Sequence, residues 1–263
     1  SGEPLFYHRF GELLRMVRPP TKIRFNSNAV LLTQEKIDLI METGVVDVLN
    51  FSLDAATEET YRKIRGRGFN RVVRNISNLN KAKQARGRSA HEGIPFIVVN
   101  MCITRANYRE LPQFVRLAKE LGAGAIDLFH MNKGLDWQRT VADDFVFDYQ
   151  EQEQIDPVEH DDIIIESHAL AREIGVDMNF VGTVFLTEQE SEAKTEVGEE
   201  IKELNRWEHG CLAPWSRAVV GVDGNVRMCY FHKEWEESIG NLIFNSFDEI
   251  WNGEKARQVR EEF

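Results

Sequence analysis

The stretch FNSNAVLLTQEKIDLIMETGVVDVLNFSLD, residues 25–54, contains a strand–helix–strand unit and decides the fold class. Its middle places apolar residues at helical spacing, between a Thr33 that suits an N-cap and a Gly44 that suits a helix end. Residues 45–54 are then nearly continuously apolar, which is typical of a strand buried on both faces of a parallel sheet. This unit predicts an α/β protein.

The same pattern of helix, glycine and short apolar strand occurs three times, in METGVVDVLNFS, KELGAGAIDLFH and REIGVDMNFV. A further strand is predicted over residues 94–105, a helix over 161–174, and one terminal amphipathic helix within 246–263. Repeated β/α units indicate a parallel sheet, either doubly wound or curled into a barrel, and periodicity does not separate the two. In both folds the chemistry takes place at the carboxyl ends of the strands.

The composition is that of a globular protein: the 263 residues are 42% hydrophobic and 29% charged. A formal net charge of −11 disfavours a nucleic-acid partner, and no run of about 18 apolar residues is available to span a membrane. Three cysteines, an odd number in a chain of this length, argue against a disulfide framework and indicate a reducing, cytoplasmic setting.

Charge is distributed unevenly along the chain. Residues 62–88 contain ten basic residues and no acidic one, whereas residues 136–208 contain 21 acidic and 5 basic residues. The basic run is either a solvated helix face or a docking surface for an acidic partner or an anionic substrate.

A change of composition predicts two domains. The first spans residues 1–184 and carries an acidic, aromatic-bearing insertion at 134–160. Residues 185–208 are highly charged and read as a linker or an exposed helix. The second domain, residues 209–263, contains a predicted β-hairpin.

Short polar and acidic residues end the predicted strands. They stand in four stretches: Glu3 between Gly2 and Pro4 in GEP, Asn26 and Asn28 in FNSN, Ser52 and Asp54 in FSLD, and His130 in FHMN. Such residues could hold a small zwitterionic ligand, with Glu3 binding an ammonium group while hydroxyls and amides bind a ribose or a carboxylate. Taken singly, each also has a structural explanation, as a helix cap or a turn residue.

The cysteines leave several roles open. Cys102 stands in the middle of a predicted strand and is interpreted as a small buried residue. Cys211 and Cys229 flank the predicted hairpin, whose turn is formed by residues 223–225. They could form a buried pair, or a zinc half-site completed by a neighbouring histidine.

In this order, the stretches resemble the radical S-adenosylmethionine (SAM) enzymes. GEP resembles the family's glycine-glycine-glutamate-proline motif, and FNSN, LLT, SLDA and YRKIRG resemble its run from the third to the fourth strand. CLAPW, VDGNVRMC, IGNL and SFDEIWN resemble the SPASM/twitch extension of the same superfamily. The resemblance implies a partial (β/α) barrel of the TIM type, followed by a small α+β SPASM/twitch-like domain.

The resemblance also implies cofactors and their ligands. A 4Fe–4S cluster and SAM would serve the barrel, with Glu3 receiving the SAM ammonium group and Ser52 its carboxylate or ribose. Asn26 and Asp54 would shape the pocket. The remaining residues of the four stretches would also belong to the cofactor site: Gly2, Pro4, Asn28 and His130. Cys211 and Cys229 would be ligands of an auxiliary iron–sulfur cluster.

The chain departs from the family pattern at several positions. Ala29 and Ala55 stand where relatives have glycine, and Tyr230 stands where some relatives have a second cysteine. The Cys-x-x-x-Cys-x-x-Cys loop that holds the catalytic cluster is absent from these 263 residues. The resemblance therefore implies a chain truncated at both ends, without the first β/α unit, that is inactive by itself.

For the intact protein, the resemblance implies reductive cleavage of SAM to a 5′-deoxyadenosyl radical. That radical would abstract hydrogen from a peptide or a small molecule. The charge pattern adds the hypothesis that an acidic flavodoxin- or ferredoxin-type electron donor docks on the basic run, residues 62–88. Two alternatives remain: a non-catalytic barrel that binds a peptide or a partner, and an ordinary metal-dependent β/α-barrel enzyme.

Overall fold

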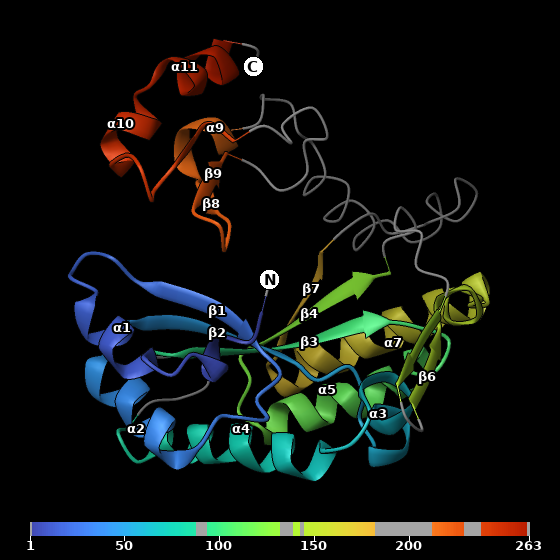
Figure 1. The fold of residues 1–263 in the computed structure, drawn as a ribbon. Helices are drawn as coiled ribbons and strands as arrows, with labels where there is room; N and C mark the ends of the chain where they lie inside the picture. The colour runs from blue at the N-terminus through green and yellow to red at the C-terminus, as the bar shows by residue number, and fades with distance from the viewer. Residues whose placement is uncertain are drawn as a thin grey trace. The chain divides into compact units, whose positions relative to one another are not determined.

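A five-stranded parallel sheet forms the centre of the first part of the molecule (Figure 1). The computed structural model describes residues 2–87, 94–131, 139–142, 145–181, 212–228 and 238–261. The sheet has the order β1-β2-β3-β4-β7. Its strands are β1 (Ile23–Ser27), β2 (Val46–Ser52), β3 (Phe96–Ile103), β4 (Ala125–His130) and β7 (Asp177–Val181). Because each strand pairs with the next one along this order in parallel, all carboxyl ends meet at one edge.

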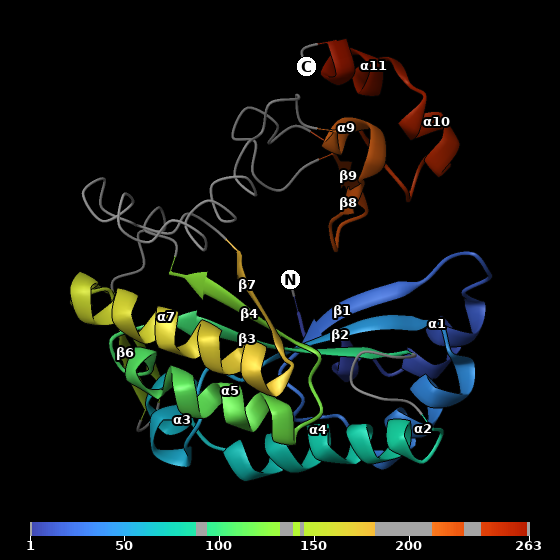
Figure 2. The ribbon, with the colours of Figure 1, turned by 180° about the vertical axis from the view of Figure 1, so that it is seen from behind.

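The described helices of this part lie on one face of the sheet, as the two opposite views show (Figures 1 and 2). They include α1 (Phe10–Met16), α2 (Gln34–Thr43), α3 (Glu58–Arg65), α4 (Phe69–Gln84), α5 (Leu111–Glu120) and α7 (Pro157–Ile174), with the 3₁₀ helices η1 (Pro4–Phe6) and η2 (Tyr108–Glu110). A doubly wound sheet carries helices on both faces, whereas a β/α barrel carries them on the outside only. The one-sided arrangement therefore corresponds to part of a barrel, and the predicted fold class is confirmed.

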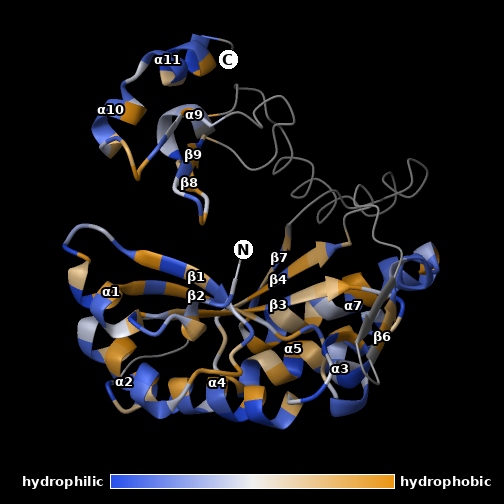
Figure 3. Ribbon diagram, in the orientation of Figure 1, coloured by the Kyte–Doolittle hydropathy of each residue, from blue (hydrophilic) through white to orange (hydrophobic). Residues whose placement is uncertain are grey.

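The local signals of the opening stretch are confirmed. The Thr33 hydroxyl accepts the N–H of Lys36 at 3.4 Å, and Gly44 ends α2 with a φ of 60°. Alternating residues of the strands pack against the helices, and Leu49 and Phe51 of β2 are both 0% exposed. The strands are accordingly apolar over much of their length (Figure 3). This alternation leaves the other residues of each strand on the face away from the helices.

The acidic insertion is partly described. It contains an antiparallel hairpin of β5 (Arg139–Ala142) and β6 (Phe145–Asp148), followed by the short helix α6 (Tyr149–Gln152). The predicted helix 161–174 begins earlier, at Pro157, because the Asp156 side chain accepts the backbone N–H groups of Val158 and Glu159. A proline in the first turn suits this start, because an N–H at that position would have no partner within the helix.

The chain divides into two compact units, Ser1–Leu186 and Thr187–Phe263. The predicted linker, residues 185–208, lies outside the described residues. In the second unit, β8 (Val219–Val220), β9 (Asn225–Arg227) and β10 (Gly240–Asn241) form a three-stranded antiparallel sheet. The helices α9 (Ala213–Ser216), α10 (Phe247–Trp251) and α11 (Glu254–Glu261) accompany it.

The predicted hairpin of the second unit is confirmed by β8 and β9, with Gly224 at a φ of 81° in the turn. The prediction of one terminal helix was wrong, because α10 ends before Asn252 and a separate helix follows. At Gly253 a Cβ would lie 2.8 Å from the carbonyl oxygen of Glu249. Glycine therefore allows the backbone to approach this closely between α10 and α11. No helix among the described residues is long and apolar enough to cross a membrane.

Candidate functional site

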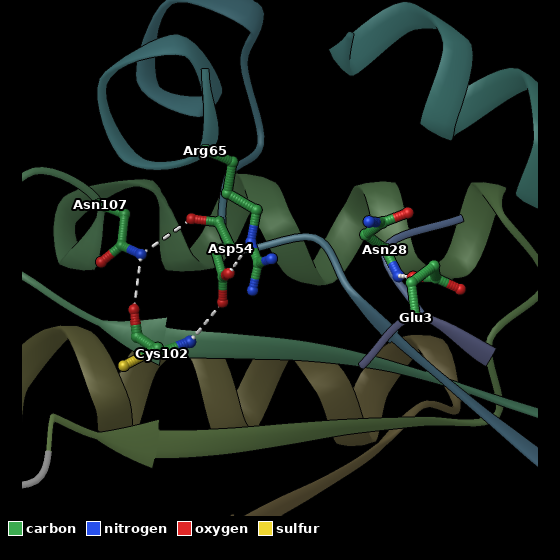
Figure 4. A network of polar contacts seen from close by, with 6 residues as sticks. All are labelled: Glu3, Asn28, Asp54, Arg65, Cys102 and Asn107. Carbon is green, nitrogen blue, oxygen red and sulfur yellow. Dashed lines mark hydrogen bonds and ion pairs between the residues drawn. The ribbon is translucent and has the colours of Figure 1, made fainter. Parts of the chain in front are cut away.

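The carboxylate of Glu3 lies beside the end of β1 and is held there by three donors. Its Oε1 accepts the backbone N–H of Leu5 at 3.1 Å and the hydroxyl of Ser27 at 2.8 Å. Its Oε2 accepts the backbone N–H of Asn28 at 2.9 Å (Figure 4). A carboxylate offers about four lone-pair positions, so this half-buried group keeps capacity for one more donor.

The neighbours of Glu3 set its position. Pro4 is the first residue of η1, where its fixed φ suits the start of a helical turn. Gly2 is exposed, and no atom lies within 4 Å of the place where its Cβ would stand. Pro4 thus starts the turn that follows Glu3, and the space beside Gly2 is open.

The two predicted asparagines of β1 have different partners. Asn26 accepts a hydrogen bond from the Asn50 side chain of the neighbouring strand at 2.9 Å, on the face away from the helices. The Asn28 side chain instead accepts the N–H of Val30 at 2.9 Å, within a turn where Ala29 adopts a φ of 58°. The side chain of Asn28 thus supports the turn, while its backbone N–H fixes Glu3.

Asp54 is buried, with 3% of its surface exposed, and both of its carboxylate oxygens are engaged. Oδ1 accepts the backbone N–H of Cys102 at 2.7 Å, and Oδ2 forms an ion pair with the Arg65 guanidinium (Figure 4). The Asp54 backbone has a φ of 59°, in the left-handed region that aspartate tolerates better than most residues. Asp54 therefore joins the ends of β2 and β3 to α3 rather than offering a free carboxylate.

Asn107 completes this network and was not predicted from the sequence. Its side-chain amide donates to the backbone oxygens of Asp54 at 2.8 Å and Cys102 at 2.9 Å, and its Oδ1 accepts the N–H of Thr104 at 2.7 Å. The residue is 0% exposed. An asparagine just after a predicted strand end is the available signal, but its partner across 53 positions becomes visible only in the fold.

Ser52 stands at the end of β2 and pairs in register with Asn100 of β3. Ser52 is half-buried, and its side chain lies on the face away from the helices, because its neighbours Phe51 and Leu53 pack into the core. Asn100 was not predicted as a site residue. A polar residue inside the apolar run IPFIVVNMCIT was the signal available for it.

His130 lies elsewhere. It follows Ile126 and Leu128 at intervals of two residues along β4, and these two residues are 0% exposed against the helices. Because side chains alternate along a strand, His130 points to the same face as they do. Its ring contacts that of His160 on α7, with 5.3 Å between the centroids. His130 is thus the last residue of β4 but faces the helices, so the structure does not place its side chain with Asn26 and Ser52, which lie on the opposite face.

The cysteines are described unequally. Cys211 and Cys229, the predicted cluster ligands, lie outside the described residues. Cys102 has a free thiol that is half-buried rather than fully buried, on the same face of β3 as Asn100. Burial, and next the negative charge of Asp54, raise the pKa of this thiol to about 12, although the Arg65 charge acts in the opposite direction.

Comparison with known proteins gives two family matches. Residues 1–118 match the radical SAM superfamily, and residues 211–263 match SPASM, an iron–sulfur cluster-binding domain. These matches imply SAM, a 4Fe–4S cluster and auxiliary iron–sulfur clusters as cofactors. Together they cover both ends of the chain.

Individual relatives agree with these matches. The mycofactocin maturase MftC of Mycobacterium tuberculosis is 34% identical over 125 residues, which cover 47% of this chain and 29% of the maturase. The AdoMet-dependent heme synthase of Methanosarcina barkeri is 25% identical over 99% of this chain and 69% of its own length. The crystal structure of Streptococcus suis SuiB has a TM-score of 0.67 at 13% identity, covering 100% of this chain and 56% of SuiB. The SuiB likeness shows the fold.

The described residues fit SAM. Glu3 offers a fixed carboxylate for an ammonium group, and Ser52 offers a hydroxyl at the adjoining strand end. Asn100, in register with Ser52, has a buried Oδ1 without a hydrogen-bond partner. Acceptors and a hydroxyl on neighbouring strands are the groups that a zwitterionic nucleoside requires.

The described residues do not hold an iron–sulfur cluster. Thiolates are the usual ligands of such clusters, and Cys102, the one described cysteine, is kept protonated by its raised pKa. Within the described ranges, no group of three or more His, Cys, Asp or Glu side chains could hold a metal ion.

Proposed function

Because residues 1–118 belong to the radical SAM superfamily and residues 211–263 to the SPASM domain family, we propose that the protein is a radical SAM enzyme. We propose that it acts on a peptide or a small molecule. The observation that carries this function is the Glu3 carboxylate, fixed by Ser27 and Asn28 at the strand end next to Ser52.

In this proposal Glu3 binds the ammonium group of SAM, and Ser52 binds its carboxylate or ribose. Asn26 shapes the pocket, and Asp54 positions the ends of β2 and β3 around it. When bound, SAM together with a reduced 4Fe–4S cluster supplies a carbon radical that abstracts hydrogen from the substrate. The chain itself orients the cofactor and excludes water from the site.

Cys211 and Cys229 are proposed as ligands of the auxiliary cluster. Their support is the SPASM match, which spans both positions. Thiolates are the common protein ligands of iron–sulfur clusters, and each cluster takes about four. Anaerobic reconstitution followed by iron and sulfide analysis should therefore show less iron per chain in Cys211→Ser than in the unchanged protein.

A peptide is the substrate class that we favour. The fold of this chain is also that of SuiB, which has been crystallised with the precursor peptide SuiA. A small molecule is the second proposed substrate class. It is suggested by the relative named AdoMet-dependent heme synthase, whose alignment covers 99% of this chain.

The proposed activity is tested with the full-length protein. After anaerobic iron–sulfur reconstitution, dithionite and SAM should give 5′-deoxyadenosine in amounts that rise with protein concentration. A non-catalytic binding protein would give none under the same conditions, and that result would overturn the proposal.

We expect Glu3→Gln to weaken SAM binding by about 10- to 100-fold, since a hydrogen bond between charged groups contributes about 1.5–3 kcal/mol. Glutamine keeps an acceptor for Ser27 but loses the charge that attracts the ammonium group. Equilibrium dialysis of SAM with the reconstituted protein measures the change. Glu12→Gln is the matched control, since Glu12 lies on α1 in an exposed pair with Arg9. Equal affinities of the two variants would contradict the assignment.

An acidic flavodoxin- or ferredoxin-type donor is proposed to dock on the basic surface formed by Arg67, Arg71 and Arg74, which are all exposed. Arg65 is excluded from it, because it is paired with Asp54. Reversing Arg71 and Arg74 to Glu should slow cluster reduction by flavodoxin about tenfold at low salt and much less at high salt.

Two controls accompany the charge reversal. Reduction by dithionite should be unchanged, since it needs no docking. Reversal of Arg116 and Lys119, a pair of exposed cations with the same spacing on α5, should leave the flavodoxin rate unchanged. If both double variants behave alike, donor docking on this surface is refuted.

A further inference from the structure

Four polar residues form a row across the sheet on the face away from the helices. Register places Ser52 of β2 beside Asn100 of β3, Asn100 beside Asp127 of β4, and Asp127 beside Asn179 of β7. Neighbouring strands are about 4.8 Å apart, so each side chain is within reach of the next. We call these four residues the polar row.

The face of the polar row follows from strand alternation. Ile126 and Leu128, on either side of Asp127, are 0% exposed against the helices, and so are Val99 and Met101 beside Asn100. The side chains between them must therefore point to the opposite face. The hydrogen bond from the Asn179 side-chain amide to Asp127 Oδ1, at 2.9 Å, joins β7 to the same row.

Asn100 shows that the row lacks a partner. The residue is 8% exposed, and its Oδ1 is buried without a hydrogen-bond partner. Buried polar atoms are nearly always paired, because an unpaired one loses its hydration without compensation. A ligand that donates a hydrogen bond at this point would satisfy the amide.

The charged groups of the strands and of the strand ends are unequally matched. Arg24 of β1 is paired with Asp47 at 2.7 Å, and Arg65 is paired with Asp54. Among the described residues, the Asp127 carboxylate has no cation within ion-pair distance, and it accepts one hydrogen bond, from the Asn179 side chain. The β4–β7 end of the row is therefore rich in acceptors and negatively charged.

We propose that Asp127, held by Asn179 and next to Asn100, binds a positively charged, hydrogen-bond-donating group of the substrate. An ammonium or a guanidinium group fits this set, because it supplies several donors and the opposite charge. The inference rests on the proposed function in that SAM and substrate must meet on this face. It assigns SAM to the end of the row near Glu3 and the substrate's cation to the β4–β7 end.

The test uses three short capped peptides, N-acetyl-Gly-X-Gly-amide with X as lysine, arginine or norleucine. Binding to the full-length, reconstituted, SAM-loaded protein is measured by saturation-transfer difference NMR. The lysine or the arginine peptide should bind at least tenfold more tightly than the norleucine peptide. Asp127→Asn, which keeps the shape and removes the charge, should abolish that difference.

The matched control is Asp38→Asn, which removes an exposed carboxylate that accepts a hydrogen bond from Gln34 on α2. It should leave the preference for a cation unchanged. Equal binding of the three peptides, including no binding of any, would overturn the inference, and so would an undiminished preference in Asp127→Asn. SAM affinity measured on the same samples separates this result from the proposed function, because it should change less than twofold in Asp127→Asn.

Discussion

Replacement of Asp54 by alanine should lower the free energy of unfolding by about 3 kcal/mol. The change removes the acceptor of the Cys102 N–H, and an unsatisfied buried donor costs about 1–3 kcal/mol. It also breaks the pair with Arg65, which is worth about 1 kcal/mol because 32% of the Arg65 side chain is exposed. Urea unfolding followed by circular dichroism, on otherwise identical samples, measures the loss.

Two further variants separate the contributions of Asp54. Asp54→Gly loses the same partners but should be about 1 kcal/mol less destabilising than alanine, because the backbone φ of 59° strains a residue with a Cβ. Asp54→Asn keeps an acceptor for Cys102 and tolerates the left-handed conformation, so it should lose about 1 kcal/mol. The control variant Asp38→Ala changes an exposed residue, so its free energy of unfolding should lie within about 0.5 kcal/mol of that of the unchanged protein. Equal losses for alanine and asparagine would show that the Cys102 hydrogen bond does not stabilise the fold.

The strands and helices of the first unit could largely be predicted because they depend on local signals. Alternating burial, a capping threonine and a terminal glycine act within a few residues of one another, as they do around α2. The choice between a barrel and a doubly wound sheet could not be made from periodicity, since both have the same β/α units. It depends on which face the helices cover, and that is a property of the whole sheet.

In the candidate site, too, some residues can be predicted from local sequence motifs and others only from the arrangement of the whole sheet. Glu3 and Ser52 are predicted from motifs, whereas the placement of Asn100 and Asp127 depends on the register between strands that are far apart in the sequence. For His130, the position within the strand already indicates which face of the sheet its side chain occupies. It shares parity with Ile126 and Leu128, so its place on the helix side followed from alternation alone.

The turn after β1 shows how a departure from a family motif can leave the backbone unchanged. Ala29 stands where the resemblance to the family motif implies a glycine, yet it adopts a φ of 58° and is 0% exposed. The Asn28 side chain accepts the N–H of Val30 across this turn, and the Asn75 side chain donates to the Ala29 oxygen at 2.8 Å. These contacts hold the left-handed conformation without glycine, and so they keep the Asn28 N–H directed at Glu3.

Cys102 should react with iodoacetamide about 1,000-fold more slowly at pH 8 than a cysteine with an ordinary pKa. The thiolate is the reactive form, and burial together with the Asp54 charge raises the pKa of this thiol from 9.0 to about 12. Three units of pKa lower the thiolate fraction by about three powers of ten at a pH below both values. Mass spectrometry of the peptide that contains Cys102 measures its alkylation separately from that of the other two cysteines.

The same labelling in 6 M guanidinium chloride is the control, because unfolding removes both causes of the raised pKa. Labelling of the folded protein within tenfold of that rate would contradict the expected protection. Asp54→Asn gives a further check on the folded protein, since loss of the negative charge should lower the pKa of Cys102 and speed its alkylation. If the variant reacts no faster while circular dichroism shows it folded, burial alone sets the pKa. Asp54 would then support the strand ends through its hydrogen bond and ion pair, without an electrostatic effect on the thiol.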